Sequence, residues 1–312
     1  MSTKTQIFSD RQQMQHHTFE IFRYKDAVPK DVALHHHDFY EIYFFLSGSV
    51  LYNIESRSYL LTPGDILLIH PMQLHQPIFD GKSGNYERIV LWLNANFLDQ
   101  FGINGENLAA CFHSARPGHA GLLRPDEHVR QKLHYLLELL LQEQHVNEYG
   151  HEISCLSYLA LILSQLCRLS IQEPQEVENA GASRVVYDIL EYINEHFHED
   201  LSLDSLANRF FISKYHLSRE FTKVTGSSVH RYVTQRRLIT AKQMMSEGIS
   251  TTSVCQQCGF GDYSSFYRAF KSAYQISPRD FALRLKKYSS DSEDPTYFLR
   301  EYLEQASEKE LP

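Results

Sequence analysis

The stretch LDSLANRFFISKYHLSREF, residues 203–221, decides the fold of the C-terminal part of this chain. Apolar residues recur at helical spacing over residues 203–210, which predicts one short amphipathic helix. Ser213 then provides a good N-cap for a second helix, whose apolar side has Leu217 and Phe221. A short helix, a tight turn and a capped helix form a helix-turn-helix pattern, in which the second helix is the one that enters the major groove of DNA.

Basic and aromatic residues occupy the other positions of this second helix. Because these positions project away from the core, they lie where residues that read bases and phosphates must lie. They are Lys214, Tyr215, His216, Arg219 and Lys223.

A second unit of the same kind follows about fifty residues further on. Residues 250–258 predict a short helix, residues 259–261 a turn, and Asp262 a cap for a helix over 263–273. Residues 229–245 lie between the two units and predict one helix of about 25 Å. One rigid helix of that length would set two recognition helices near one turn of DNA apart.

The charge of the chain is unevenly distributed. The net charge is −8, but residues 207–288 contain 14 basic and 4 acidic residues. Residues 1–206 contain 14 against 27, and residues 289–312 contain 2 against 7. A basic block inside an acidic chain is the electrostatic pattern of a domain that binds a polyanion.

The C-terminal motifs resemble those of the AraC-type (AraC/XylS) transcription regulators. The resemblance rests on GFGDYSSFYRAFK, residues 259–271, on the following Ser277-Pro278, and on matching residues of the first unit and the connecting helix; it covers about residues 185–284. The sequence departs from the family at Ala282, where the family often has Arg. The resemblance implies double-stranded promoter DNA and RNA polymerase as partners, and activation rather than repression.

The resemblance also implies which residues contact DNA. The two arginines are the strongest candidates for base contacts, since Arg is the commonest specific reader of guanine. Base-edge readers would be Tyr215, His216, Ser218 and Arg219 in the first unit and Tyr263, Ser264, Tyr267 and Arg268 in the second, with Lys223 and Lys271 nearer phosphate.

The N-terminal part has a different pattern. Short runs rich in Ile, Val, Tyr and Phe over residues 18–93 alternate with turn-formers and predict a small β-sandwich or barrel. Apolar residues at helical spacing over about 126–171 predict a helical hairpin. Its wide apolar faces could pack on the barrel or against a second copy of the chain.

A cluster of histidines precedes one of the predicted strands. In an extended chain His35, His37 and Glu41 share one face, and His75 comes from a later turn. The spacing of these residues, with Gly48 and Gly64, resembles the two motifs of the cupin superfamily, although the usual leading Gly is absent near Pro29. AraC-type regulators often have such a barrel as their effector-binding domain.

Two chemistries suit this set of side chains. His35, His37, Glu41 and His75 can bind a divalent metal such as Mn, Fe, Ni or Zn, which would favour a cupin enzyme. They can instead hydrogen-bond the hydroxyls of a small sugar-like effector in the barrel. Because no phosphate loop, nucleophile elbow or HExxH helix is present, we expect an effector site, no enzyme activity and no cofactor.

The predicted fold class is therefore α+β with two domains. Residues 1–171 form a cupin-like β-barrel and helical hairpin for effector binding and dimerisation, and residues 172–182 form a linker. Residues 183–288 form an all-α domain with two helix-turn-helix units joined by a long helix, and 289–312 an acidic tail. A polar N-terminus, five cysteines and no long apolar run predict a cytoplasmic protein that does not bind a membrane. Cys255 and Cys258 are expected to be core residues.

Overall fold

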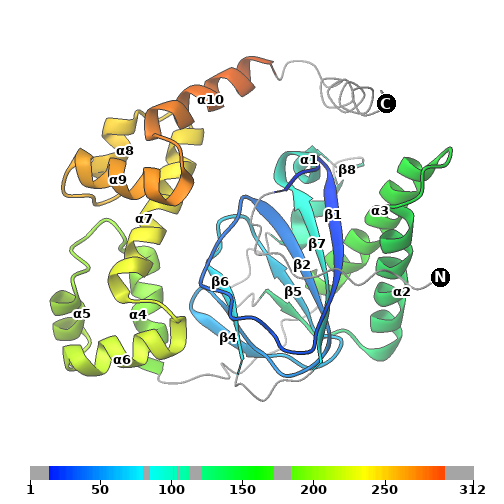
Figure 1. Cartoon of the computed structure of the whole chain (residues 1–312), viewed down its shortest axis with the longest axis horizontal. Coiled ribbons are helices and arrows are strands. Elements are labelled where there is room, and N and C mark those ends of the chain that lie inside the picture. The colour runs from blue at the N-terminus through cyan, green and yellow to red at the C-terminus, as the bar shows by residue number, and fades with distance from the viewer. Residues whose placement is uncertain are drawn as a thin grey trace. The chain divides into compact units, whose positions relative to one another are not determined.

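The computed structural model describes residues 14–79, 85–100, 102–103, 106–112, 121–171 and 184–291. The chain divides into two compact units, Met1–Ala182 and Ser183–Pro312 (Figure 1). The predicted linker, residues 172–182, lies outside the described residues, as does the acidic tail from residue 292. A sheet-rich N-terminal unit and a helical C-terminal unit confirm the predicted fold class.

The described part of the first unit contains two larger antiparallel sheets and one two-stranded sheet. The largest has the strand order β1-β7-β2-β5-β10 and the second the order β4-β3-β6. A two-stranded pair, β8 and β9, and two short helices, α1 and η1, follow β7. The elements are β1 (Phe19–Asp26), β2 (Phe39–Ser47), β3 (Leu51–Ile54), β4 (Arg57–Leu60), β5 (Ile66–Ile69), β6 (His75–Ile78), β7 (Tyr86–Asn94), α1 (Ala95–Gln100), β8 (Gly102–Ile103), β9 (Glu106–Asn107), η1 (Leu108–Cys111) and β10 (Leu122–Leu123).

Strand β2 shows why the unit is layered. Its sequence FYEIYFFLS is apolar at almost every position, which is typical of a strand that is buried on both faces. Phe39, Tyr43 and Phe45 belong to the core between the two sheets. Ile42 and Phe44 belong to a second core, which the large sheet shares with helices.

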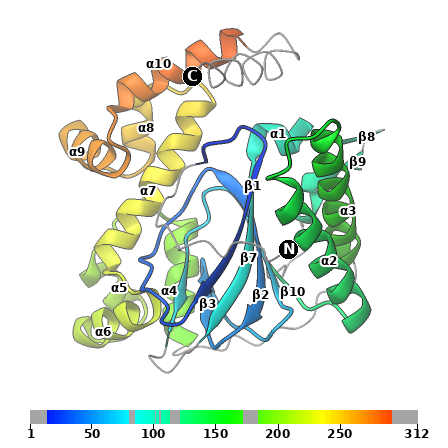
Figure 2. The ribbon, with the colours of Figure 1, turned by 45° about the vertical axis from the view of Figure 1, so that its right-hand side comes forward.

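Helices α2 (Glu127–Glu143) and α3 (His151–Ile171) form the predicted hairpin and cover the outer face of the large sheet (Figure 2). The buried side chains of the hairpin therefore pack on the sheet. They include Leu133, Leu136, Leu137, Leu140, Leu141, Leu159, Ile162, Leu163 and Leu166.

Helix α3 is also long and apolar enough, over His151–Ser170, to cross a membrane by length and composition alone. Packing on the sheet accounts for one side of the helix, whereas Ile153, Leu156 and Leu161 remain exposed on it.

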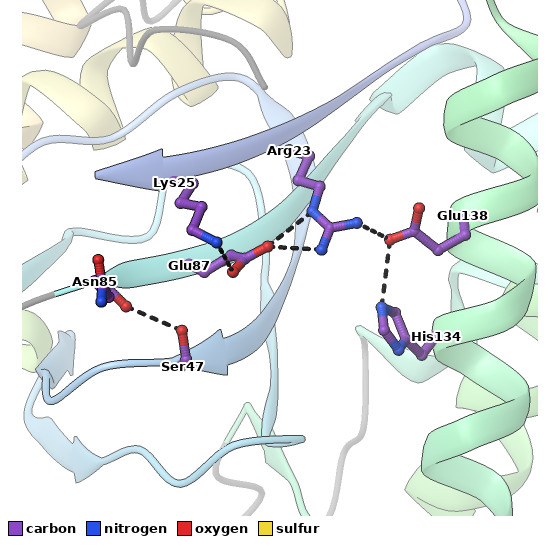
Figure 3. A network of polar contacts seen from close by, with 7 residues as sticks. All are labelled: Arg23, Lys25, Ser47, Asn85, Glu87, His134 and Glu138. Atoms are coloured by element: carbon purple, nitrogen blue, oxygen red, sulfur yellow. Dashed lines mark hydrogen bonds and ion pairs between the residues drawn. The ribbon is translucent and has the colours of Figure 1, made fainter. Parts of the chain in front are cut away.

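Polar side chains connect the large sheet to the hairpin (Figure 3). Arg23 of β1 donates to Glu87 of the neighbouring β7 at 2.6 Å and also pairs with Glu138 of α2. Lys25 Nζ lies 3.4 Å from Glu87, and His134 Nε2 lies 3.3 Å from Glu138. This network joins three elements on the face of the sheet that the helices cover.

The second unit is helical throughout its described part, as expected. Both predicted helix-turn-helix pairs are present, α5–α6 and α8–α9, and the long connecting helix α7 joins them (Figure 1). The helices are α4 (Arg184–Glu195), α5 (Leu203–Arg209), α6 (Lys214–Thr225), α7 (Val229–Ser246), α8 (Thr251–Gln257), α9 (Tyr263–Tyr274) and α10 (Pro278–Asp291).

Two contacts hold the segment between α4 and α5 against the rest of this unit. Arg237 of α7 donates to the carbonyl oxygens of Phe197 at 2.8 Å and Glu199 at 2.7 Å. Gly259, between α8 and α9, lies so close that a Cβ there would be 2.7 Å from the carbonyl oxygen of His198. The segment therefore contacts both the connecting helix and the second helix-turn-helix unit.

Candidate functional site

The structure brings the four predicted effector residues of the N-terminal unit together. His35 and His75 form a bridge between their backbones, and their rings lie 4.2 Å apart. The rings of His37 and His75 lie 4.8 Å apart, and His37 Nε2 is 3.2 Å from Glu41 Oε2. His37, Glu41 and His75 are all buried.

Hydrogen bonds fix the orientation of the three imidazoles. The Nδ1 atoms of His35, His37 and His75 each lie 2.9 Å from a backbone carbonyl oxygen, of Ala33, Phe39 and Gln73 respectively. A carbonyl oxygen can only accept, so each neutral ring has its proton on Nδ1 and a free lone pair on Nε2. The three rings thus present acceptor or ligand atoms to the cluster.

Burial and the neighbouring groups also shift the pKa values of this cluster at His75 and Glu41. Desolvation, together with the charges of His35 and His37, lowers the pKa of His75 well below its usual range. Burial alone would raise the pKa of Glu41, but the interactions with the adjacent His37, with His35 and with the Trp92 N–H outweigh it and lower the pKa. The site therefore combines a carboxylate with imidazole lone pairs.

These atoms fit a divalent metal ion. One ligand atom from each of His37, Glu41 and His75 lies within 4.8 Å of the others. The Nε2 atoms of His37 and His75 are buried and make no hydrogen bond to any residue that the structure describes. Imidazole Nε2 whose Nδ1–H is bonded to a carbonyl is the usual arrangement of a metal-bound histidine.

Trp92 also contacts this cluster, although the motifs do not include it. It is buried between the sheets, but its Nε1–H donates to Glu41 Oε2 at 2.8 Å. The register of β2 against β7 places Glu41 opposite Trp92. Nothing in the sequence alone reveals that register, so no sequence signal could have identified this hydrogen bond.

In the second unit, α6 presents the predicted readers to solvent. The Ser213 side chain accepts from the backbone N–H of His216 and caps the helix, and Leu217 and Phe221 are buried. Arg219 is exposed and forms an ion pair with Glu220 at 3.0 Å. The other exposed readers are Tyr215, His216, Ser218 and Lys223.

Helix α9 presents a similar face. The Asp262 side chain accepts from the backbone N–H of Ser265, and Phe266 and Phe270 face the core. Among the predicted readers Tyr263, Ser264, Arg268 and Lys271 are exposed. Tyr267 is half-buried, and Lys271 Nζ lies 5.8 Å from the centre of its ring.

Cys255 and Cys258 belong to the core of this second unit. Both thiols are free, and Cys258 Sγ lies 3.6 Å from Met244 Sδ. Their position in the core is the one that the sequence predicted.

Comparison with known proteins matches both units to families. A family model described as a helix-turn-helix domain matches residues 206–284, which include both recognition helices. A model described as an AraC-like ligand binding domain matches residues 21–161, which include the histidine cluster. The two models together match most of the chain.

The chain is also similar to curated relatives and to solved structures. The chain is 26% identical over 252 residues to the HTH-type transcriptional activator RhaS of Escherichia coli K12, covering 80% of this chain and 87% of RhaS. It is 14% identical to ToxT of Vibrio cholerae with bound unsaturated fatty acid, over 86% of this chain and 96% of that one, with a TM-score of 0.36. It is 27% identical to the C-terminal domain of AraT of Geobacillus stearothermophilus, over 33% of this chain and 86% of that one, with a TM-score of 0.32.

Proposed function

The chain belongs to the AraC family of transcription regulators, with a ligand-binding domain and a helix-turn-helix domain. We therefore propose that it activates transcription when a small molecule binds its N-terminal domain. The DNA partner is a double-stranded promoter, which the chain recognises through α6 and α9. RNA polymerase is the partner that activation requires. We place this activity in the cytoplasm.

The observation that supports DNA reading is the pair of capped helices with outward arginines. Arg219 on α6 and Arg268 on α9 are both exposed, whereas the apolar residues of each helix are buried. Residues 207–288, which include both helices, have an excess of positive charge. These features suit a helix that lies in the major groove and contacts both bases and phosphates.

In vitro selection from a random pool of DNA duplexes tests this proposal with the full chain. We expect enrichment of one bipartite sequence, and binding to it should weaken steeply as salt increases because phosphate contacts release counterions. Failure to enrich any sequence, or affinity that does not change with salt, would contradict the proposal.

For the effector we propose a small polyhydroxylated molecule of the carbohydrate class. His35, His37 and His75 offer imidazole lone pairs, and Glu41 offers a carboxylate, all of which accept hydrogen bonds from hydroxyl groups. Trp92 and Phe39 provide apolar ring surface beside them, with ring centres 4.6 Å apart. Such a combination of few polar groups and aromatic walls is typical of small-molecule sites.

A reporter assay with His37→Ala tests the effector site. His37→Ala should abolish ligand-dependent control while the affinity for selected DNA stays unchanged, since the reading helices lie in the other unit. His36→Ala is the matched control, because His36 is the neighbouring histidine and is not part of the cluster of His37, Glu41 and His75. An unaltered ligand response in His37→Ala would contradict the proposed site.

The second candidate is a metal-dependent cupin enzyme, and the two unbonded Nε2 atoms favour it. His37, Glu41 and His75, with His35 beside them, would bind a divalent ion such as Mn, Fe, Ni or Zn, which would supply Lewis-acid chemistry. Elemental analysis of purified protein distinguishes the two candidates. About one equivalent of metal per chain, together with unaltered ligand control in His37→Ala, would favour the enzyme.

We further propose a homodimer that uses the outer face of α3. Ile153, Leu156 and Leu161 are exposed apolar residues on this helix, and the sheet covers only its other side. A second copy that packs against them would bury a face that otherwise stays in water.

A further inference from the structure

The first helix of the first helix-turn-helix unit ends in a strained turn. Phe211 follows α5 with a φ of 55°, in the left-handed region. Its N–H donates to the carbonyl of Asn208 at 3.4 Å, and the N–H of Ile212 donates to that of Ala207 at 3.0 Å. This bonding is that of a Schellman motif, whose left-handed residue is usually glycine.

The second unit has the same motif and has glycine at the matching position. Gly259 follows α8 with a φ of 75°, and its N–H donates to the carbonyl of Gln256 at 3.3 Å. The N–H of Phe260 donates to that of Cys255 at 3.3 Å. The duplicated unit therefore shows, within one chain, which residue the backbone alone prefers at this position.

Among the described residues, the Phe211 side chain finds no burial that would compensate for this strain. A bulky residue with positive φ is a genuine conformational outlier. The Phe211 side chain is 95% exposed, so it gains no burial. The apolar contact that accompanies a Schellman motif comes from the residue after the left-handed one, and this residue, Ile212, is partly buried.

We propose that Phe211 contacts DNA through the apolar surface of the groove, either a thymine methyl group or a deoxyribose. This inference rests on the proposed function. Phe211 lies two residues before Ser213, which caps α6. In a helix-turn-helix the first helix crosses the backbone while the start of the second contacts base edges, so the turn between them lies at the margin of the groove.

The surroundings of Phe211 favour DNA over a protein partner. Tyr215, the second residue of α6, is 77% exposed and lies on a predicted reading position. Lys214 between them is exposed as well, although it pairs with Asp204. An aromatic ring beside a basic side chain suits a groove lined by phosphates and apolar sugar or methyl surface.

The test measures stability and DNA affinity of the full chain, using the duplex obtained by selection. Phe211→Gly removes both the strain and the ring, and Phe211→Asn keeps a side chain that tolerates positive φ. Leu283→Ala, at an exposed apolar residue of α10, is the control. We expect both Phe211 variants to melt at or above the wild-type temperature and to bind the duplex at least about fivefold more weakly.

Replacing each thymine of the duplex by uracil then identifies the contacted group. If Phe211 contacts a methyl group, wild-type binding weakens by about threefold at one thymine and Phe211→Gly is insensitive there. If no thymine responds but Phe211→Gly still binds weakly, the contact is with a deoxyribose.

Other outcomes overturn the inference. Wild-type DNA affinity in Phe211→Gly and Phe211→Asn would exclude the contact, and loss of RNA polymerase-dependent activation alone would assign Phe211 to a protein partner. If the Phe211 variants lost no more DNA affinity than Leu283→Ala, the loss would be a non-specific surface effect. A wild-type chain that selects no duplex would instead refute the proposed function itself.

Discussion

Replacing Gly259 by alanine should destabilise the second unit more than the same change at any open glycine. The φ of 75° costs an alanine about 1–2 kcal/mol. In addition, the new Cβ would lie 2.7 Å from the carbonyl oxygen and 2.8 Å from the Cα of His198, both backbone atoms. Because backbone must shift to relieve such overpacking, we add about 1–3 kcal/mol.

Gly248→Ala is the matched control. Gly248 also follows a helix, α7, with a φ of 85°, but nothing lies within 4 Å of a Cβ there. Its substitution measures the conformational cost alone, about 1–2 kcal/mol. The difference between the two variants therefore isolates the close approach of the α8–α9 turn to the segment before α5.

Urea unfolding with two probes provides the assay. Far-ultraviolet circular dichroism follows the helices of both units, and the fluorescence of Trp92 follows the first unit alone, since the chain has one tryptophan. A loss of helix signal that precedes the Trp92 transition therefore reports the second unit. The Trp92 transition should be unchanged in both variants. Equal destabilisation by Gly248→Ala and Gly259→Ala would refute the packing described for Gly259.

Three further predictions concern other surfaces. Leu161→Asp should reduce self-association in sedimentation without unfolding the chain, because Leu161 is exposed. Leu163→Asp should instead unfold the chain, because Leu163 is buried. Unchanged self-association in Leu161→Asp would exclude this face of α3 as the dimer interface. Burial alone would raise the pKa of Glu87, but the hydrogen bond and charge of Arg23 and the charge of Lys25 outweigh it and lower that pKa. Because this pKa is lower in the folded chain, the ionised Glu87 stabilises the fold above the unfolded-state pKa of about 4.3, and this stabilisation is lost as the pH falls through the folded-state pKa. The difference in unfolding free energy between wild type and Glu87→Gln should therefore shrink in acid. A difference that does not change with pH would contradict the ion pair. Lys271→Ala should weaken binding to all duplexes about equally and reduce the salt dependence, and a base-specific loss would contradict a phosphate contact.

Much of the fold could be predicted because the local signals agree with the final packing. Strand β2 is a long apolar run, and Ser213 and Asp262 are strong N-caps that begin the helices where they were expected. The sequence signals of β4 and β6 are weaker, since RSYL and HQPI are short and polar in part, and β6 contains Pro77. Their pairing with β3 comes from tertiary structure rather than from propensity.

The sites were predictable only where residue type and spacing are sufficient. The alternation of His35, His37 and Glu41 correctly placed three side chains in one cluster with His75. The hydrogen bond from Trp92 depends on the register between β2 and β7. The left-handed turn at Phe211 depends on backbone angles, because a phenylalanine gives no sequence signal for positive φ.

The most direct test of DNA reading by two helices is a base-pair scan of the selected duplex with wild type, Arg219→Ala and Arg268→Ala. Each variant should lose about 1–3 kcal/mol of binding free energy. Arg219→Ala should relax the preference at one cluster of base pairs, and Arg268→Ala at another about 10 base pairs away. If both variants relaxed the preference at the same base pairs, or if both kept wild-type specificity, DNA reading by two separate helices would be contradicted.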